Sequence, residues 1–207
     1  MKRKPLFFMV HGIRAKDHGA SSMGLLARLL NQSFSFVKQV IYGYVLVPIT
    51  NKKAVQAVVE AIGRYKDYDG DVVVVGYSNG AWAAVQAAEM GHKIDHLVLI
   101  SPALHRSHAI PEHVKHVSVF YCPDDSVVGL GAWYRRVVNL MPWNWEIFGG
   151  DPHDWGAMGK YGYVGNDKRV TNYKMSEGVG HFWFKNEKEV MRIASFIETF
   201  YEDHRDK

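Results

Sequence analysis

Short runs of apolar residues recur along the chain, and they constrain its fold more than any other feature. The run at 72–76 reads VVVVG and is rich in β-branched residues, which favour strands. It does not alternate between apolar and polar positions, and continuous runs are typical of parallel strands buried on both faces. The runs that we interpret as strands are 6–10, 43–47, 72–76, 96–100, 116–121 and 170–175.

Helical patterns separate these runs. One of them places Ala54, Val58 and Ile62 on the same side of a helix, and Asn51 or Thr50 can cap its N-terminus. Because strands and helices alternate, the sequence predicts an α/β fold. We expect a three-layer α/β/α sandwich around a mostly parallel six-stranded sheet, with right-handed crossovers. The predicted helices are 22–36, 51–66, 79–91, 128–140 and 187–203.

The composition is that of one globular domain over residues 1–207. Hydrophobic residues make up 47% and charged residues 22%, and the length suits one well-cored domain rather than two. The net charge of +4 comes from 25 cationic and 21 anionic side chains, and the one tight cationic cluster is Lys2, Arg3 and Lys4. Because nucleic-acid binding needs cations gathered on one face, we expect no nucleic-acid partner.

Cysteine usage and the N-terminal run bear on the compartment. Cys122 is the single cysteine, so it can form no intramolecular disulfide. The apolar run at 5–10 is short for a signal peptide and far too short for a membrane span. We therefore expect a cytoplasmic protein without stable membrane insertion, and the sequence does not predict its oligomeric state.

Gly76, Ser78 and Gly80 form a G-x-S-x-G pattern where a predicted strand gives way to a predicted helix. Side chains at the two flanking positions would collide in so sharp a turn, and glycine avoids that collision. The serine is then held in a strained conformation with its hydroxyl projecting beside free N–H groups of the helix. Any strand-to-helix turn can carry these residues, but the valine run before it and the alanine-rich helix after it favour Ser78 as a nucleophile.

A serine nucleophile needs a base, and eleven histidines compete for that role. His181 follows the last predicted strand, and Gly178 and Gly180 leave room around its ring. A residue in this loop can reach the carboxyl edge of the sheet, where catalytic groups collect. The sequence therefore indicates His181 as the base.

Other histidines suit different roles. His92 and His96 are expected at the surface. Four more cluster in one stretch, and only Glu112 offers a carboxylate among them, so a solvated loop is favoured over a metal site. These four are His105, His108, His113 and His116.

The histidine needs a carboxylate to orient it, and the oxyanion needs two N–H donors. Asp124 and Asp125 follow the predicted strand 116–121, and at most one of these adjacent residues can face the histidine. The backbone N–H groups of Asn79, directly after the nucleophile, and of Ile13, in the loop after the first strand, are the candidate donors. In that loop Gly12 permits a close approach to the site, and His11 is interpreted as a structural hydrogen-bonding residue.

These motifs resemble those of the α/β-hydrolase superfamily over most of the chain. MVHGI is similar to the family's oxyanion strand and loop, GYSNG to its nucleophile elbow and LVLISPA to the strand that follows. CPDDSVV is similar to its acid turn and GVGHF to its histidine loop. The resemblance implies a triad of Ser78, Asp125 and His181. It favours Asp125 over Asp124 because Asp125 begins the D-x-x-V pattern that is common at this turn.

Two departures from the family are expected. The chain begins at the family's third strand, which leaves a minimal fold without the first two strands. Only residues 101–115 stand where a cap often follows, and a glycine-rich, aromatic insertion near the active site lies instead at 141–169.

The aromatic side chains of this insertion either line an acyl or ring pocket or pin the loop against the sheet, and the sequence leaves both open. Tyr77 and Trp155 are the candidate substrate-binding residues. Asp151, His153 and Asp154 fit helix capping better than metal binding. The insertion's aromatic residues in question are Trp143, Trp145, Trp155, Tyr161 and Tyr163.

The resemblance implies a small serine hydrolase that cleaves carboxylic esters through an acyl-enzyme intermediate. It requires no metal or organic cofactor, and its partner is a small-molecule or acyl-ester substrate. A thioesterase or acyltransferase with the same triad is an alternative, and so is a non-catalytic binding module on the same scaffold. The three occupied triad positions argue against the binding module.

Overall fold

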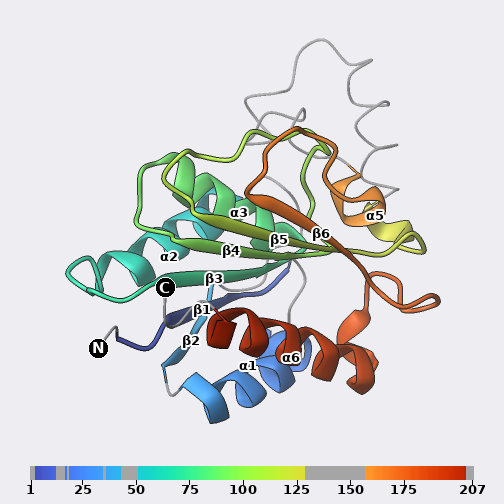
Figure 1. Ribbon diagram of the computed structural model, residues 1–207, viewed down its shortest axis with the longest axis horizontal. Coiled ribbons are helices and arrows are strands. Elements are labelled where there is room, and N and C mark those ends of the chain that lie inside the picture. The colour runs from blue at the N-terminus through green and yellow to red at the C-terminus, as the bar shows by residue number, and fades with distance from the viewer. Residues whose placement is uncertain are drawn as a thin grey trace.

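The computed structural model describes residues 3–12, 17, 19–34, 36–42, 51–128 and 157–203 of the chain. Within these residues the strands form a six-stranded sheet in the spatial order β2-β1-β3-β4-β5-β6, and each neighbouring pair is parallel (Figure 1). The strands are β1 (Leu6–Val10), β2 (Val37–Val40), β3 (Val72–Tyr77), β4 (His96–Ile100), β5 (His116–Tyr121) and β6 (Val170–Lys174).

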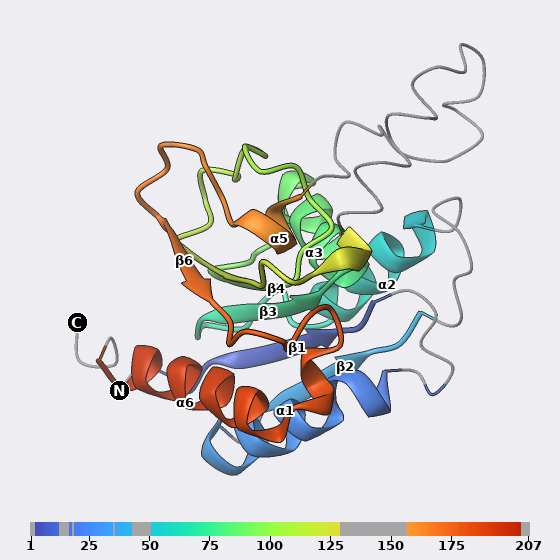
Figure 2. The ribbon, with the colours of Figure 1, turned by 90° about the vertical axis from the view of Figure 1, so that its right-hand side faces the viewer.

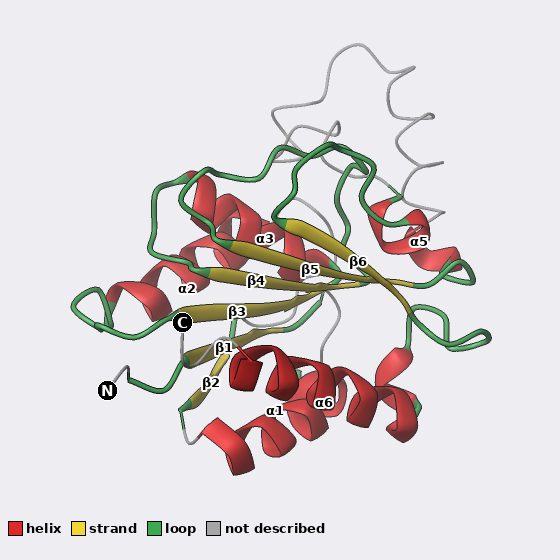
Figure 3. Cartoon of the chain, viewed as in Figure 1, coloured by secondary structure: helices red, strands yellow, loops and turns green. Residues whose placement is uncertain are grey.

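Helices cover both faces of this sheet (Figure 3). On one face α1 (Ala20–Phe34) packs beside α6 (Glu187–Asp203), and on the other α2 (Asn51–Gly63) packs beside α3 (Asn79–Glu89). The predicted α/β sandwich of three layers is therefore confirmed. None of the described helices is long and apolar enough to cross a lipid bilayer. Two shorter elements were not predicted, α5 (Met158–Tyr161) and the 3-10 helix η4 (Trp183–Lys185).

Alternate residues of the central strands face opposite layers, so the sheet has a core on each side. In β3, Val72 and Val74 pack in the same cluster as α2 and α3, whereas Val73 and Val75 pack with α1 and α6. Every residue of β1, β3 and β4 is buried. Burial on both faces is the reason why these strands read as apolar runs without alternation.

The strand beside β1 differs from our prediction. We expected a strand at 43–47, which lies outside the described residues, and the observed strand is β2, at Val37–Val40. Its two central residues, Lys38 and Gln39, are exposed, so β2 shows no apolar run. Among the described strands it lies at the edge of the sheet, where only part of a strand needs to be buried.

Helix boundaries also differ in places. The helix predicted at 22–36 is Ala20–Phe34, because the chain beyond it must extend to form β2. The helix predicted at 51–66 ends at Gly63. The helix predicted at 128–140 lies outside the described residues from 129 onward.

The strand order creates a switch point between β1 and β3. The chain crosses from β1 to β2 on one side of β1, and it then crosses from β2 to β3 on the other side, because β1 lies between β2 and β3. In open α/β sheets, ligands bind in the crevice at the carboxyl ends of the strands at such a point. There, His11 and Gly12 follow β1, and Ser78 follows β3. Figure 2 views the molecule from the side of these carboxyl ends, where α5 and the segment that enters α6 also lie.

Arg169, directly before β6, holds the loop that precedes β5. Its guanidinium donates hydrogen bonds to backbone carbonyls of that loop and to the Asp167 carboxylate, and it lowers the pKa of Asp167. The bond lengths to the carbonyls lie between 2.7 and 3.0 Å. The accepting carbonyls belong to Ile110, Pro111, Glu112 and Val114.

Replacing Arg169 with lysine is expected to lower the free energy of unfolding by about 2 kcal/mol. An ammonium group cannot reproduce the fork of N–H donors, so part of this loop loses its hydrogen bonds. Urea denaturation measures the change, with Arg64→Lys at an exposed position just after α2 as the control. Equal stability of the two variants would show that the Arg169 bonds do not stabilise the fold.

Candidate active site

Ser78 lies in a strained turn between β3 and α3. Its backbone has φ 54° and ψ −117°, a region that non-glycine residues seldom adopt and that costs on the order of 1–3 kcal/mol. A Cβ atom at Gly76 would lie 2.5 Å from Ala81 Cα, and one at Gly80 would lie 2.3 Å from the Val10 carbonyl oxygen. The turn therefore needs glycine on both sides of the serine, because the first turn of α3 lies against Gly76 and the end of β1 lies against Gly80.

Asp125 lies after β5 and contacts His181 in the segment before η4. The Oδ2 atom of Asp125 is 2.8 Å from Nδ1 of His181, and its Oδ1 accepts a hydrogen bond of 3.0 Å from the Val128 N–H. Asp125 is fully buried and His181 is nearly so. The contact uses Nδ1, which leaves Nε2 as the nitrogen that can exchange a proton with a substrate or nucleophile.

Asp124 has a different partner from its neighbour. Its Oδ2 accepts a hydrogen bond of 2.7 Å from the backbone N–H of Gly178, three residues before His181. The two adjacent aspartates therefore bind two parts of one segment. Asp124 holds the backbone, and Asp125 holds the imidazole ring.

Tyr77 packs against His181 and is only 5% exposed. Its hydroxyl donates a hydrogen bond of 3.0 Å to the His181 carbonyl, and the two ring centroids are 5.1 Å apart. The Tyr77 ring also packs edge-on against Trp183 and Phe184. Burial, and secondarily the charge of Asp125, raise the pKa of Tyr77. The Tyr77 side chain thus links the segment that carries His181 to the turn at Ser78.

The loop after β1 passes close to the serine. A Cβ atom at Gly12 would lie 3.2 Å from Ser78 Cβ, so this position has little room for a side chain. Asn79, the first residue of α3, has a backbone N–H at the helix N-terminus, where no carbonyl of the preceding turn accepts it. Of the other expected site residues, Ile13 and Trp155 lie outside the described residues.

His11 is held between neighbouring loops. Its Nδ1 lies 2.7 Å from the Gly12 carbonyl oxygen, and its ring stacks on that of Tyr42 with centroids 4.1 Å apart. The Tyr42 hydroxyl donates a hydrogen bond to the His11 carbonyl, and burial raises the pKa of Tyr42. A Cβ atom at Gly19 would meet His11 Cβ at 2.5 Å, so Gly19 completes the enclosure.

The other histidines in the described part of the chain form no cluster that could bind a metal. The described residues contain no group of three or more His, Cys, Asp or Glu side chains that could hold one. His108 binds Glu89 at 2.8 Å, and His113 binds a backbone carbonyl. The expected surface position of His96 was wrong, because its ring is buried between Ser118 and Tyr201 and hydrogen bonds to both.

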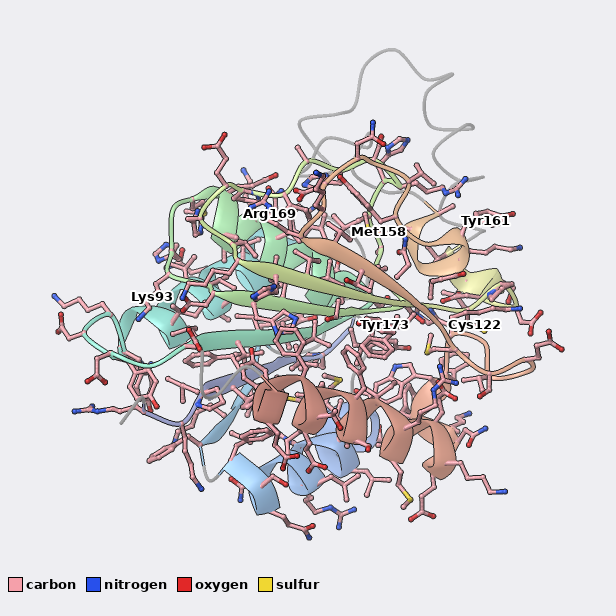
Figure 4. The ribbon with its side chains drawn as sticks, viewed as in Figure 1. Lys93, Cys122, Met158, Tyr161, Arg169 and Tyr173 are labelled. Carbon is pink, nitrogen blue, oxygen red and sulfur yellow. The ribbon has the colours of Figure 1, made fainter. Side chains whose placement is uncertain are left out.

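The described end of the predicted insertion is fixed at the carboxyl edge of the sheet. Met158 and Gly159 donate backbone hydrogen bonds to the loop after β4, and the Gly159 carbonyl accepts one from Cys122. In Figure 4, Cys122 and Tyr161 lie at this edge, and Lys93 lies at the opposite one. Tyr161 is 51% exposed, so its ring does not pin this segment against the sheet. The tryptophans of the insertion lie outside the described residues.

Comparison with known proteins identifies the fold. No protein-family model matches the chain, and no curated protein matches its sequence. A lidless α/β serine hydrolase from Xanthomonas campestris is similar in structure, with a TM-score of 0.61 and 13% identity over 98% of this chain and 83% of that chain. The chain has the α/β-hydrolase fold.

Two further solved structures are similar over almost the whole chain. An esterase from Pyrococcus furiosus has a TM-score of 0.60 and 12% identity over 98% of this chain and 82% of its own. Est1E from Butyrivibrio proteoclasticus has a TM-score of 0.59 and 13% identity over 100% of this chain and 90% of its own. Identities this low show the fold alone, so any activity must be argued from the residues of the site.

Sequence reasoning missed how the candidate site is supported. It named Tyr77 as a substrate-binding residue and gave Asp124 no role beyond an alternative acid. In the structure, the Tyr77 hydroxyl donates a hydrogen bond to the His181 carbonyl, and the Asp124 carboxylate accepts one from the Gly178 N–H in the same segment. No signal in the sequence pointed to the contact of Asp124 with Gly178 or to that of Tyr77 with His181.

Proposed function

We propose that this protein is a serine hydrolase that cleaves carboxylic esters, with Ser78 as nucleophile, His181 as base and Asp125 as the residue that orients the base. The observation that carries the proposal is the buried 2.8 Å contact between Asp125 and His181, which Tyr77 joins to the strained turn of Ser78 at the switch point of the sheet. A strained residue and a buried carboxylate–imidazole pair are both costly to keep, and a nucleophilic site uses both.

Each group has a defined part in the reaction. Ser78 Oγ attacks the ester carbonyl carbon while His181 Nε2 takes the hydroxyl proton. The tetrahedral intermediate then expels the alcohol, which receives that proton from His181, and leaves an acyl group on Ser78. Water, deprotonated by His181, attacks the acyl group and restores the free serine. Throughout, Asp125 holds the ring by Nδ1 and stabilises the imidazolium.

Two backbone N–H groups are proposed to stabilise the oxyanion. One belongs to Asn79, at the N-terminus of α3, where the helix dipole also favours negative charge. The other is that of Ile13, after the close approach of Gly12 to Ser78. Each such donor contributes about 3 kcal/mol in comparable sites. The chemistry proceeds with these groups and water alone, and Trp155 is proposed to contact the substrate.

The names of similar structures support an ester as the substrate. Among them are an esterase from Pyrococcus furiosus, an arylesterase and a metagenome-derived lipolytic enzyme. Residues 129–156 lie outside the described part of the chain, so the preferred acyl chain length has to be measured.

Hydrolysis of p-nitrophenyl esters from acetate to palmitate tests the proposal. We expect turnover by the wild type and a loss of at least about a thousandfold in kcat for Ser78→Ala. Ser21→Ala, at an exposed serine of α1, is the control and should match the wild type. An acyl thioester of the best chain length separates esterase from thioesterase activity. A Ser78→Ala enzyme that retains a tenth of the wild-type rate would refute the assignment.

A further inference from the structure

The segment that carries His181 cannot hold its own position. Residues 176–181, here called the histidine segment, contain Gly178 and Gly180, whose φ angles are 75° and 60°. Glycines in this left-handed region have many accessible conformations when nothing restrains them. Because the imidazole must stay within hydrogen-bond reach of its partners, contacts from outside the segment have to fix it.

One of these contacts comes from Glu189, in the first turn of α6. Its carboxylate is 2% exposed, and its Oε2 accepts a hydrogen bond of 2.6 Å from the Ser176 hydroxyl. The Ser176 N–H lies 3.4 Å from the same oxygen. Arg192, one turn further along α6, contacts both Glu189 and Ser176. Its Nη1 lies 3.5 Å from Glu189 Oε1 and 3.2 Å from Ser176 Oγ, and its Nη2 donates to the Lys174 carbonyl at 2.6 Å.

The residues just before α6 offer the Glu189 carboxylate another hydrogen-bond partner, in a capping box with Asn186. Asn186 accepts a hydrogen bond from the Glu189 N–H through Oδ1, at 3.3 Å, which is half of a capping box. In a complete box the Glu189 carboxylate would return to the Asn186 N–H, but that N–H donates to the Trp183 carbonyl instead. The carboxylate leaves its own helix and reaches the start of the histidine segment.

A buried carboxylate is costly unless donors surround it. Here the Ser176 hydroxyl, the nearby Arg192 guanidinium and the positive end of the α6 dipole offset that cost. At the middle of the histidine segment, Asp124 binds the Gly178 N–H, and at its end Tyr77 binds the His181 carbonyl. Contacts thus hold the segment at its start, its middle and its end, and Glu189 supplies the one at the start.

We propose that Glu189 is a positioning residue that acts through Ser176 to hold the histidine segment, and with it the His181 ring, in reach of Asp125 and Ser78. This role rests on the proposed function of the triad. Without the bond, Ser176 is free to move and the glycines after it transmit the movement to His181. The imidazole then spends less time in the productive position, while the surface that binds the substrate is unchanged.

The test compares Glu189→Gln with Glu187→Gln. Both variants remove a negative charge from the first turn of α6, but Glu187 is exposed and its side chain has no part in the Ser176 contact. We expect Glu189→Gln to lower the kcat for p-nitrophenyl ester hydrolysis about tenfold, with KM changed less than about twofold. Rates are divided by the concentration of sites that a fluorophosphonate labels, which removes any effect of unfolded protein.

Ser176 gives the second half of the test. Glutamine has a single acceptor oxygen and cannot serve Ser176 and Arg192 at once, as the two oxygens of Glu189 do. Ser176→Ala should therefore lower kcat as Glu189→Gln does, and the double variant should be no slower than either single one, because both changes act on the same contact. Ser176→Thr keeps the hydroxyl and should retain most of the activity. Additive losses, or equal kcat per site in Glu189→Gln and Glu187→Gln, would overturn the proposal.

A readout without turnover separates this proposal from the proposed function. The Nδ1 proton of His181, held by Asp125, should exchange with water at least about threefold faster in Glu189→Gln than in Glu187→Gln, as measured by NMR. His181→Gln assigns the signal. A wild type that cleaves no ester but shows this difference would refute the hydrolase and keep the positioning role. Equal exchange rates would refute the positioning role whatever the activity.

Discussion

Asp125→Asn is expected to lower kcat for ester hydrolysis by roughly 10³–10⁴-fold, with little change in KM. Asparagine has nearly the shape of aspartate, so its carbonyl oxygen can still accept the Val128 N–H. Its amide then presents N–H donors to His181 Nδ1, which favours the tautomer with the proton on Nε2. That tautomer cannot take the proton of Ser78, so the site keeps its geometry and loses its base.

Asp124→Asn is the matched control for this prediction. The side chain of Asp124 binds the Gly178 N–H, and an amide oxygen can still accept that bond. We expect a loss of no more than about tenfold, since only the charge on the acceptor is removed. Thermal unfolding of both variants shows whether either change disturbs the fold. A larger loss for Asp124→Asn than for Asp125→Asn would mean that the acid has been assigned to the wrong residue.

Gly80→Ala is expected to have the largest effect on stability, at least about 3 kcal/mol of unfolding free energy. The added Cβ would lie 2.3 Å from the Val10 carbonyl oxygen and 2.4 Å from that of His11. Both are backbone atoms at the end of a buried strand, so neither can rotate away as a side chain would. Either α3 or β1 must shift, and each shift moves the strained turn at Ser78.

Gly24→Ala provides the comparison, because Gly24 lies in the interior of α1 and no atom lies within 4 Å of an added Cβ. Alanine at such a site should raise stability by about 0.5–1 kcal/mol through helix propensity. Urea denaturation of the two variants gives opposite signs if the close approach at Gly80 is real. A Gly80→Ala protein as stable as the wild type would show that α3 does not lie against β1 as described.

The central strands could be predicted because their environment is uniform. Val72, Val73, Val74 and Val75 face two different cores, and each core requires an apolar residue. The edge strand β2 could not be found in this way. Its exposed Lys38 and Gln39 are compatible with a loop, and only pairing with β1 makes them a strand.

The residues of the candidate site also differ in how far they could be predicted. Gly76, Ser78 and Gly80 form a local pattern whose steric reason can be worked out from the turn itself. By contrast, Asp125 and His181 are 56 residues apart, and the resemblance of their motifs to the family's acid turn and histidine loop, not the spacing, suggested their pairing. The contacts of Tyr77 and Glu189 depend on where the distant segment 176–181 lies in the fold. Sequence alone could not show this, because either side chain has an ordinary local role, in a strand or in a helix cap.

The most direct test of the account is the labelling of the wild-type protein with a fluorophosphonate, followed by mass spectrometry of its peptides. A serine becomes reactive to this probe only where a base and an oxyanion site activate it. We predict one label per chain, on the peptide that contains Ser78, and at least a hundredfold slower labelling in Asp125→Asn and in His181→Gln. A folded wild type that leaves Ser78 unlabelled, or that reacts equally fast in all three proteins, would contradict the proposed triad.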